Sequence, residues 1–535
     1  MNTRTWYPGL SLVLNLILSM LLPSVASAQT PAGAAPNAAS SAWMATTDPK
    51  DNPPAIPREF RGVWVATVAN IDWPSKKGLP SDQQQAEMRR ILDRAVELKL
   101  NAILLQVRPS CDAIYPSSLE PWSEFLTGQS GKPPSPEYDP LAMWIEEAHA
   151  RGLELHAWVN PFRSRHFRAE GPDAANHINI ARPDLVRKYD NLLWLDPGEP
   201  EAQEHSLRVI MDLVNRYDLD GVHYDDYFYP YPKDNVPFPD DAPFARAQAA
   251  GETRSKADWR RANIDNFVRR LYEEIKKAKP HVKVGISPFG IWRPGHPPGI
   301  AGFDAYEGLS ADARLWLREG WCDYFTPQLY WALDARQQSY TRLLDWWIAN
   351  NDQRRHMWPG NNTSRVLSAE TPEQAAAKDR RGRDSWEPAE IVSQIEETRA
   401  RALGPGGAGG NVHFSMTPLM NNHRGLVPAL TGGVYKDFAV VPASPWLARG
   451  AALPQAPAIS VSGRRLTITP DAAGTTHTRV LWQRSGGRWR MTPLPRDVMS
   501  VDLPAGPGAP DAVAIIGLDR VGRVGRAGPA TVLKR

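Results

Sequence analysis

The chain has 535 residues, which is too long for one typical domain core and predicts two domains plus extensions. Its 62 basic and 59 acidic residues leave a formal net charge of +3, and the basic residues are scattered. This balance argues against nucleic acid as a partner and gives no overall sign of a polyanionic one. The 20 tryptophans suit a carbohydrate groove, although tryptophan is also a good core residue.

The N-terminus has the pattern of an export signal. Arg4 precedes an apolar run over 10–22, and small residues follow up to Ala28. We expect a signal peptide over 1–28, cleaved after Ala28, because this run is shorter than the roughly 20 residues that span a bilayer. The mature chain should then lie in the periplasm or be secreted, without a transmembrane segment. Residues 29–57, rich in Ala, Pro, Ser and Thr, predict a disordered linker.

From Arg58, short apolar runs alternate with helical patterns. The expected strands are 62–68, 102–107, 154–159, 221–225, 283–288, 324–330, 356–359 and 412–416. The expected helices are 82–98, 140–151, 202–217, 259–279, 311–319, 339–350 and 388–401. Strand and helix alternate around eight strands, which predicts a (β/α)₈ TIM barrel over 58–440. A doubly wound open sheet would show the same alternation, but no glycine-rich phosphate turn follows the first strand.

The C-terminal part of the chain has a different sequence pattern. After Pro442, short alternating segments are separated by Gly and Pro, which is typical of antiparallel strands. We expect a small β-sandwich of the fibronectin type III kind over 441–535. It is short of acids at plausible catalytic positions, so a docking or stabilising role is expected. The fold class is therefore α/β, a TIM barrel followed by an accessory β-sandwich.

The fourth expected strand runs directly into a cluster of acids and aromatic rings, DGVHYDDYFYP at 220–230. Alternation places His223, Asp225 and Tyr227 on one face and Asp226 on the other. Chemistry in such barrels takes place at the C-terminal ends of the strands. Carboxyl groups act as acids or nucleophiles on sugars, and pyranose rings stack on aromatic faces. An acidic turn capping a strand is the alternative for an isolated Asp-Asp pair, but the other strand ends favour Asp225 as catalytic.

The remaining strand ends bring polar and aromatic side chains to the same mouth. Arg108 and Arg163 either bind acidic or acylated sugar substituents or neutralise a barrel carboxylate. Gln328, Tyr330 and Asn361 either bind hydroxyl and acetamido groups or form a hydrogen-bonded barrel layer. The expected substrate-binding residues are Trp64, Trp73, Arg108, Asp112, His156, Trp158, Asn160, Arg163, His223, Tyr227, Trp292, Gln328, Tyr330, Trp331 and Asn361.

A metal site is the other interpretation of the histidines and acids at the mouth. Zinc is usually held by closely spaced His or Cys ligands, such as a pair four residues apart on a helix. His156, His223, Asp225 and Asp226 do not form such a cluster. We therefore expect neither a metal nor another cofactor.

Six motifs carry a resemblance to a known family: RGVW at 61–64, QVRP at 106–109, EPWS at 120–123, HAWVNP at 156–161, DDYFYP at 225–230 and PQLYW at 327–331. Together they resemble the glycosyl-hydrolase-like family ten over residues 57–435. The resemblance implies a TIM-barrel hydrolase of bacterial envelope polysaccharide. The resemblance extends to divisome-localised members of the family, which cleave peptidoglycan strands stripped of their stem peptides.

The fourth strand is also similar, more distantly, to that of α-amylase-like and chitinase-like barrels. The glutamate that chitinases use as an acid falls at Tyr227, so the chitinase mechanism does not carry over whole. Tyr330 falls where a sixth-strand tyrosine supports the substrate's acetamido group in those enzymes. Substrate-assisted chemistry therefore stays open.

These observations predict a hydrolase that cleaves a β-linked, N-acetylated envelope glycan, with peptide-free peptidoglycan as the expected substrate. Asp225 would act as nucleophile or orient the substrate's acetamido group, and Asp226 would be an acid or a support. Glu307 and Asp112 are rival general acids. Two other functions stay open: a hydrolase of an exopolysaccharide such as poly-N-acetylglucosamine, and a non-catalytic glycan-binding protein.

Overall fold

The computed structural model describes residues 44–535 apart from 47, 226, 235, 369–377, 379–383, 449, 472 and 526–530. The expected signal peptide and Asp226 lie outside the described residues, as does the expected linker up to 43. Within the rest of that linker, β1 (Met44–Ala45) pairs with a C-terminal strand, and Asp51 binds Arg484. The chain therefore has defined structure before Arg58. No helix in the described part of the chain combines the length and apolar character needed to cross a membrane.

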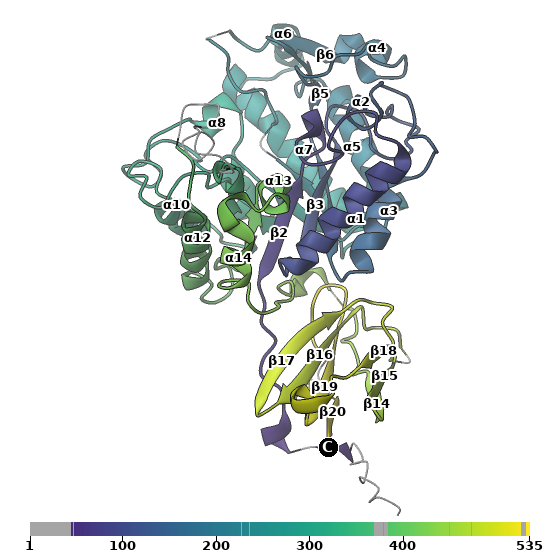
Figure 1. Cartoon of the computed structure of the whole chain (residues 1–535). Helices are drawn as coiled ribbons and strands as arrows, with labels where there is room; N and C mark the ends of the chain where they lie inside the picture. The colour runs from purple at the N-terminus through teal and green to yellow at the C-terminus, as the bar shows by residue number, and fades with distance from the viewer. Residues whose placement is uncertain are drawn as a thin grey trace, which may run out of the picture. The chain divides into compact units, whose positions relative to one another are not determined.

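A parallel sheet forms the centre of the larger part of the molecule (Figure 1). Its neighbour order is β11-β10-β9-β8-β4-β3-β2-β13-β12. The strands are β2 (Phe60–Val65), β3 (Ala102–Arg108), β4 (Glu154–Val159), β8 (Gly221–Tyr224), β9 (Lys283–Ile286), β10 (Tyr324–Phe325), β11 (His356–Met357), β12 (Gly360–Asn361) and β13 (Gly410–His413). All their pairings are parallel, as a chain of strand-helix units requires.

The sheet closes on itself because β11 and β12 are two parts of one extended segment. The Trp358 and Gly360 amides donate to the carbonyls of Phe325 and Pro327, each 2.9 Å away. On the other edge of this segment, β12 pairs with β13. Eight strand positions therefore form a ring, which confirms the prediction of an α/β, TIM-barrel-like fold.

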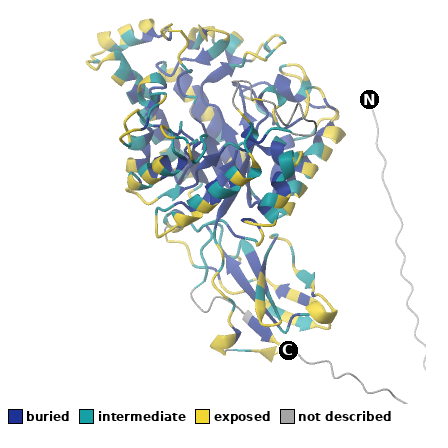
Figure 2. Ribbon diagram, turned by 60° about the vertical axis from the view of Figure 1, so that its left-hand side comes forward, coloured by how far each residue is buried: buried dark blue, intermediate teal, exposed yellow. Residues whose placement is uncertain are grey.

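Seven helices follow the strands, within one to three residues of the expected limits. They are α1 (Ser81–Glu97), α3 (Pro140–His149), α5 (Pro200–Arg216), α7 (Lys256–Ala278), α9 (Ala313–Glu319), α10 (Tyr340–Ala349) and α12 (Pro388–Ala400). Local chemistry sets their starts: the side chains of Asp139, Ser255, Asp312 and Ser339 each cap a helix, and proline opens α3, α5 and α12. Figure 2 shows the strands buried and the outer helix faces exposed.

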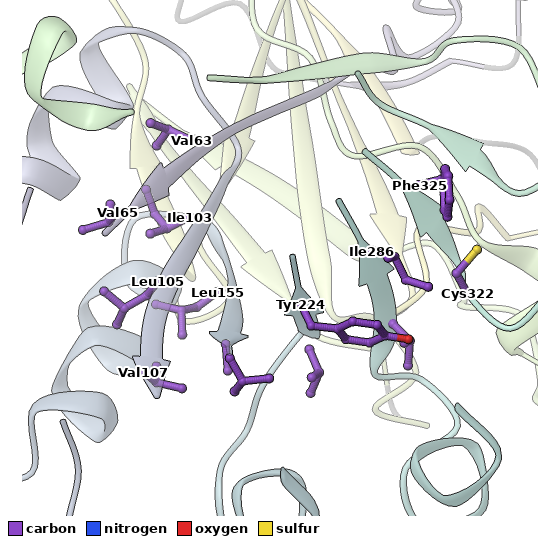
Figure 3. Packing of buried hydrophobic residues seen from close by; sticks show 14 of the residues in the cluster. Val63, Val65, Ile103, Leu105, Val107, Leu155, Tyr224, Ile286, Cys322 and Phe325 are labelled. Carbon is purple, nitrogen blue, oxygen red and sulfur yellow. The ribbon is translucent and has the colours of Figure 1, made fainter. Parts of the chain in front are cut away.

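Alternate residues of each strand pack in two different cores. The outward-facing residues, such as Val63, Ile103 and Leu105, lie against the helices, as Figure 3 shows from close by. The inward-facing residues form a second cluster that includes Trp64, Leu104, Trp158, Tyr324 and Trp358. Large rings thus fill the interior of the barrel.

The loops after β4 and β8 are among those that contain secondary structure the sequence patterns did not predict. A small antiparallel sheet follows β4, made of β5 (Arg163–Arg165), β6 (Val186–Tyr189) and β7 (Leu192–Leu195). The loop after β8 contains α6 (Asp241–Ala249). Strands of three or four residues carry too few side chains to show a period, so a pattern search misses them.

The C-terminal part consists of two antiparallel sheets. One has the order β1-β20-β19-β16-β17 and the other β14-β15-β18. Their bounds are β14 (Ala458–Ser462), β15 (Arg465–Thr469), β16 (Thr478–Ser485), β17 (Arg488–Leu494), β18 (Ser500–Asp502), β19 (Ala512–Leu518) and β20 (Thr531–Lys534). Leu466 and Ile468 from the smaller sheet share a buried cluster with Leu481, Val513 and Ile515 from the larger one. An all-β part is confirmed, while its fibronectin kind stays a prediction.

Replacing Gly285 with alanine tests the packing inside the barrel. A Cβ on this β9 residue would lie 1.9 Å from the ring of Tyr324, so the ring or the strand must move. We expect Gly285→Ala to lower the free energy of unfolding by roughly 1–3 kcal/mol in urea titrations. The control is Gly508→Ala, where a Cβ would have no neighbour within 4 Å. Equal stability of both variants would contradict this packing.

Candidate active site

Asp225 follows β8 directly and faces the inside of the barrel, as the alternation predicted. It is only 4% exposed. Its Oδ2 accepts hydrogen bonds from Trp158 Nε1 at 3.1 Å and from Asn160 Nδ2 at 2.6 Å. Its Oδ1 accepts a longer bond, 3.4 Å, from the Tyr227 amide. Two N–H donors thus converge on one carboxylate oxygen, an arrangement that suits negative charge.

Asn160 can present only its NH₂ group to Asp225. Its Oδ1 accepts hydrogen bonds from Gln106 Nε2 at 2.6 Å and from Arg163 Nη2 at 2.9 Å. Because a flipped amide would turn a donor toward two other donors, the amide orientation is determined by the network. Gln106 is itself oriented, since its Oε1 accepts the amides of Thr67 at 3.0 Å and the following residue at 2.9 Å.

Gln106 was absent from the expected site residues. It lies on β3 two residues before Arg108, so the same alternation that placed Arg108 inside the barrel also places Gln106 there. This alternation along β3 was the sequence signal that could have identified Gln106 as a site residue.

Beneath Asp225, His223 is fully buried in a polar layer. Its Nε2 lies 3.1 Å from Trp64 Nε1 and 3.1 Å from Ser287 Oγ, and its Nδ1 lies 3.1 Å from the Tyr324 hydroxyl. Because the indole N–H can only donate, Nε2 accepts and the ring proton lies on Nδ1. Burial, with a smaller contribution from His156, lowers the pKa of His223 well below its ordinary value. The imidazole is therefore neutral.

His156 lies one layer further from the mouth. Its Nδ1 is 2.8 Å from the Tyr324 hydroxyl, and its Nε2 is 3.0 Å from Glu154 Oε2. Lys283 closes this layer with an ion pair to Glu154 at 2.8 Å. His156 is 0% exposed, so its contacts are with the protein rather than with a ligand at the mouth. Tyr324, which joins the two histidines, was not among the expected site residues.

Arg108 forms a buried ion pair with Glu120. Its Nε and Nη2 lie 2.8 and 2.5 Å from the two carboxylate oxygens, and Nη1 donates to the Asn160 carbonyl at 2.7 Å. Burial acts to raise the pKa of Glu120, but Arg108 and His205 hold it at about 2. With the guanidinium fully engaged, the geometry favours the neutralising role for Arg108 over contact with a sugar.

Arg163 lies beside the site rather than in its base. Its Nε donates to the Pro109 carbonyl at 2.9 Å, and its guanidinium carbon lies 5.3 Å from the centre of the Tyr227 ring. Together with its bond to Asn160, these contacts make Arg163 a support for the residues that orient Asp225.

Like His156, the expected substrate-binding residues Trp73 and Asn361 lie away from the mouth. Trp73 is 0% exposed and packs on Trp144 at 5.4 Å, with its indole N–H on the Gln84 carbonyl. Asn361 is also fully buried and donates to Gln394 Oε1 of α12 at 2.8 Å. Asn361 thus fits the alternative of a hydrogen-bonded layer.

Glu307 and Asp112, the other two candidate general acids, lie in different environments. Glu307 lies on the short helix α8 (Ala305–Gly308) and contacts Arg261 at 3.0 Å and Arg293 at 3.4 Å. Asp112 is buried, and its Oδ1 accepts the Ser110 amide at 2.7 Å. Burial is the largest influence on Asp112 and raises its pKa.

Half-buried aromatic side chains surround the mouth. The Tyr330 ring lies 5.8 Å from Phe414, and the Trp331 ring lies 5.6 Å from Phe289. Gln328 Nε2 donates to the Ser287 carbonyl at 3.1 Å. Trp292 is set apart, since its indole stacks on Trp346 and donates to Asp312. Tyr227, Tyr330 and Trp331 are therefore the expected residues best placed to meet a sugar.

Across the part of the chain that the structure describes, no group of three or more His, Cys, Asp or Glu side chains could hold a metal ion.

Comparison with known proteins points to one family. The family described as Glycosyl hydrolase-like 10 matches residues 59–377. Glycosyl hydrolase YngK of Bacillus subtilis (strain 168) is 41% identical over 400 residues, which cover 73% of this chain and 74% of that protein. Glycosyl hydrolase DigH of Escherichia coli (strain K12) is 33% identical over 335 residues, covering 57% and 74%. The solved PgaB (BpsB) glycoside hydrolase domain from Bordetella bronchiseptica aligns with 14% identity and a TM-score of 0.45, over 70% of this chain and 98% of that one.

Replacing Glu120 tests the structural role of its pair with Arg108. Glu120→Gln leaves a buried guanidinium without a counter-charge, and we expect a loss of about 3–5 kcal/mol in the free energy of unfolding at pH 7. The folded-state pKa lies below the ordinary 4.5, so this stabilisation is complete above pH 4.5 and is lost as the pH falls toward 2. Urea titrations between pH 7 and 2.5 measure it.

The matched control is Glu396→Gln, on the exposed face of α12. It should change stability by less than about 0.5 kcal/mol. A Glu120→Gln difference that stays constant across this pH range would contradict the ion-pair assignment.

Proposed function

The chain belongs to the glycosyl hydrolase-like 10 family and is a glycoside hydrolase, and from this premise we propose that it cleaves an N-acetylated bacterial envelope glycan, with peptide-free peptidoglycan strands as the substrate. The observation that carries the proposal is the placement of Asp225. Its carboxylate lies at the inner rim of the barrel and is oriented by Trp158 and Asn160. An anionic group fixed beside half-buried aromatic rings suits sugar chemistry.

Asp225 serves in one of two ways in this proposal. As a nucleophile, it attacks the anomeric carbon and displaces the leaving oxygen. As an orienting group, it holds the substrate's acetamido group while that group's oxygen attacks instead. If Asp225 orients the acetamido group, that group also needs a hydroxyl partner. Tyr330, which lies among the mouth residues, would supply it. In both cases, the hydrogen bonds to Oδ2 fix the direction of the carboxylate.

The general acid in the proposal is Asp226, the neighbour of Asp225 in the sequence, which lies outside the described residues. Glu307 is less suited because Arg261 and Arg293 both engage its half-exposed carboxylate. Asp112 has a raised pKa, which fits a proton donor, but its carboxylate is buried and accepts the Ser110 amide of its own loop. Asp112 therefore remains the second choice.

The proposal includes export. The N-terminal pattern over 1–28 supports a cleaved signal peptide and action in the periplasm or outside the cell, where peptidoglycan is accessible. The resemblance to divisome-localised members of the family supports a role in remodelling the wall during cell division.

Asp225→Asn is the direct test of the catalytic role. We expect hydrolysis of peptide-free strands to fall by roughly 10²–10⁴-fold, because the amide cannot supply the negative charge. Mass spectrometry of the products reports both the rate and the terminal sugar, and so the bond cleaved. Asp212→Asn, at an exposed ion pair on α5, should keep full activity.

Three outcomes would contradict the proposal. Full activity of Asp225→Asn would remove this residue from catalysis. Binding of strands by the wild type without any product would indicate a glycan-binding protein. Reducing ends released from poly-N-acetylglucosamine but not from peptidoglycan would identify an exopolysaccharide hydrolase.

Asn160→Asp tests how Asp225 is held. The substitution is nearly isosteric but places a second carboxylate where an N–H donor lies 2.6 Å from Oδ2. Like charges at this distance disfavour ionisation of both groups, so the pKa of the pair rises. We expect the acidic limb of the pH–rate profile to move upward by about one unit or more, with a lower kcat. Asn215→Asp on the exposed face of α5 is the control, and an unshifted profile in Asn160→Asp would contradict the role of Asn160.

A further inference from the structure

The accessory β domain contains a hollow that the catalytic proposal does not use. It has a volume of about 820 Å³, and the residues that give it its chemistry are Lys50, Asn52, Arg484, Arg488, Trp489 and Asp511. We propose that this hollow is a second glycan-binding site, and that its ligand is a glycan strand bearing carboxylate groups. The identification of that strand as peptide-free peptidoglycan rests on the proposed function.

Two distant parts of the chain form the walls of the hollow. The N-terminal segment is attached by the pairing of β1 with β20 and by Asp51, which is 4% exposed. The Asp51 carboxylate contacts Arg484 at 2.9 Å and Lys534 at 3.3 Å. These contacts hold Lys50 and Asn52 beside the β16–β17 hairpin.

The hairpin supplies the other wall. β16 and β17 are joined by a two-residue turn, Gly486 and Gly487, with φ of 57° and 74°. Two successive positive φ angles are the requirement of a type I′ turn, which glycine meets without strain. The turn brings Arg488 and Trp489 directly to the end of the hairpin, where both line the hollow.

Arg484 holds Trp489 in place. Its guanidinium carbon lies 5.4 Å from the centre of the Trp489 ring, and its Nε lies 2.5 Å from Asp511 Oδ1. Trp482 contacts the same indole edge to face, with ring centres 6.4 Å apart. The indole is thus supported by neighbours and remains half-exposed, as a platform for a sugar ring requires.

The free charge in the hollow is positive. Arg484 is neutralised by Asp51 and Asp511. Lys50 and Arg488 are exposed, and neither has a carboxylate partner within the described ranges of the chain. A rigid indole with two unneutralised cations fits a ring that carries a carboxylate, because the ring stacks while the carboxylate binds a cation.

Peptide-free peptidoglycan has this chemistry at regular intervals. Once the stem peptide is removed, each N-acetylmuramic acid residue carries a free lactyl carboxylate next to its pyranose ring. An intact strand has peptides at these positions, and chitin has no carboxylate. The hollow would therefore distinguish stripped strands from both.

Binding of strands by the mature protein tests the site. The Asp225→Asn background keeps the strands uncut, and the probes are peptide-free strands, the same strands with their carboxyls amidated, and polygalacturonate. We expect Trp489→Ala and the double variant Lys50→Gln, Arg488→Gln each to weaken binding of peptide-free strands about tenfold, and amidation to weaken binding of the unaltered site similarly. The control is Arg490→Gln, which removes one positive charge from an exposed position of β17 outside the hollow.

The outcomes separate the two proposals. Unchanged binding in the double variant, or an equal loss in Arg490→Gln, would overturn the site, and so would equal binding of amidated strands. Because Lys50 and Arg488 are exposed, the double variant remains informative even if Trp489→Ala fails to fold. Weaker binding of polygalacturonate in the variants would support a general acidic-glycan site, while an effect on peptidoglycan alone would support a wall-specific one. Failure of the wild type to cleave the strands would count against the proposed function only.

Discussion

The hydrogen bond from Asn160 Nδ2 to Asp225 Oδ2 is the contact on which the site depends. Its direction is imposed from behind, because Gln106 and Arg163 both donate to Asn160 Oδ1. Gln106 is oriented in turn by backbone amides of the loop after β2. The carboxylate therefore takes its orientation from the packing of three adjacent strands.

The layer beneath Asp225 has to be polar without being charged. A protonated His223 so close to the site would compete with the substrate for the anion, whereas the neutral ring is hydrogen-bonded by Trp64, Ser287 and Tyr324. Burial keeps the pKa of His223 low, and Trp64 fixes its tautomer. Beyond the second histidine lies a charged group, the ion pair of Glu154 with Lys283.

Alternation along the strands predicted a large part of this arrangement. It placed His223 and Asp225 on the inner face and located the ends of the strands to within a few residues. It was less informative for Asn361, because Gly360 faces the interior near Trp64 and Asn361 consequently points toward α12. Alternation also could not predict the partner of Arg108. Glu120 contacts the guanidinium from a loop, and the path of a loop does not follow a residue period. The alternation of residues along a strand determines which face a side chain lies on, but not which residues it contacts there.

Net charge, like the alternation of residues along a strand, does not show which side chains folding brings together. The whole-chain balance of +3 gave no sign of an anionic partner, yet Lys50 and Arg488 lie more than 400 positions apart in sequence and line one hollow. A local field depends on which cations lack a counter-ion, and that is determined by folding. A site that binds a repeating polymer also needs only a low affinity for each repeat. Because a stripped strand repeats its carboxylate along its length, many positions on one polymer can occupy the hollow in turn, so even a weak site raises retention of the strand.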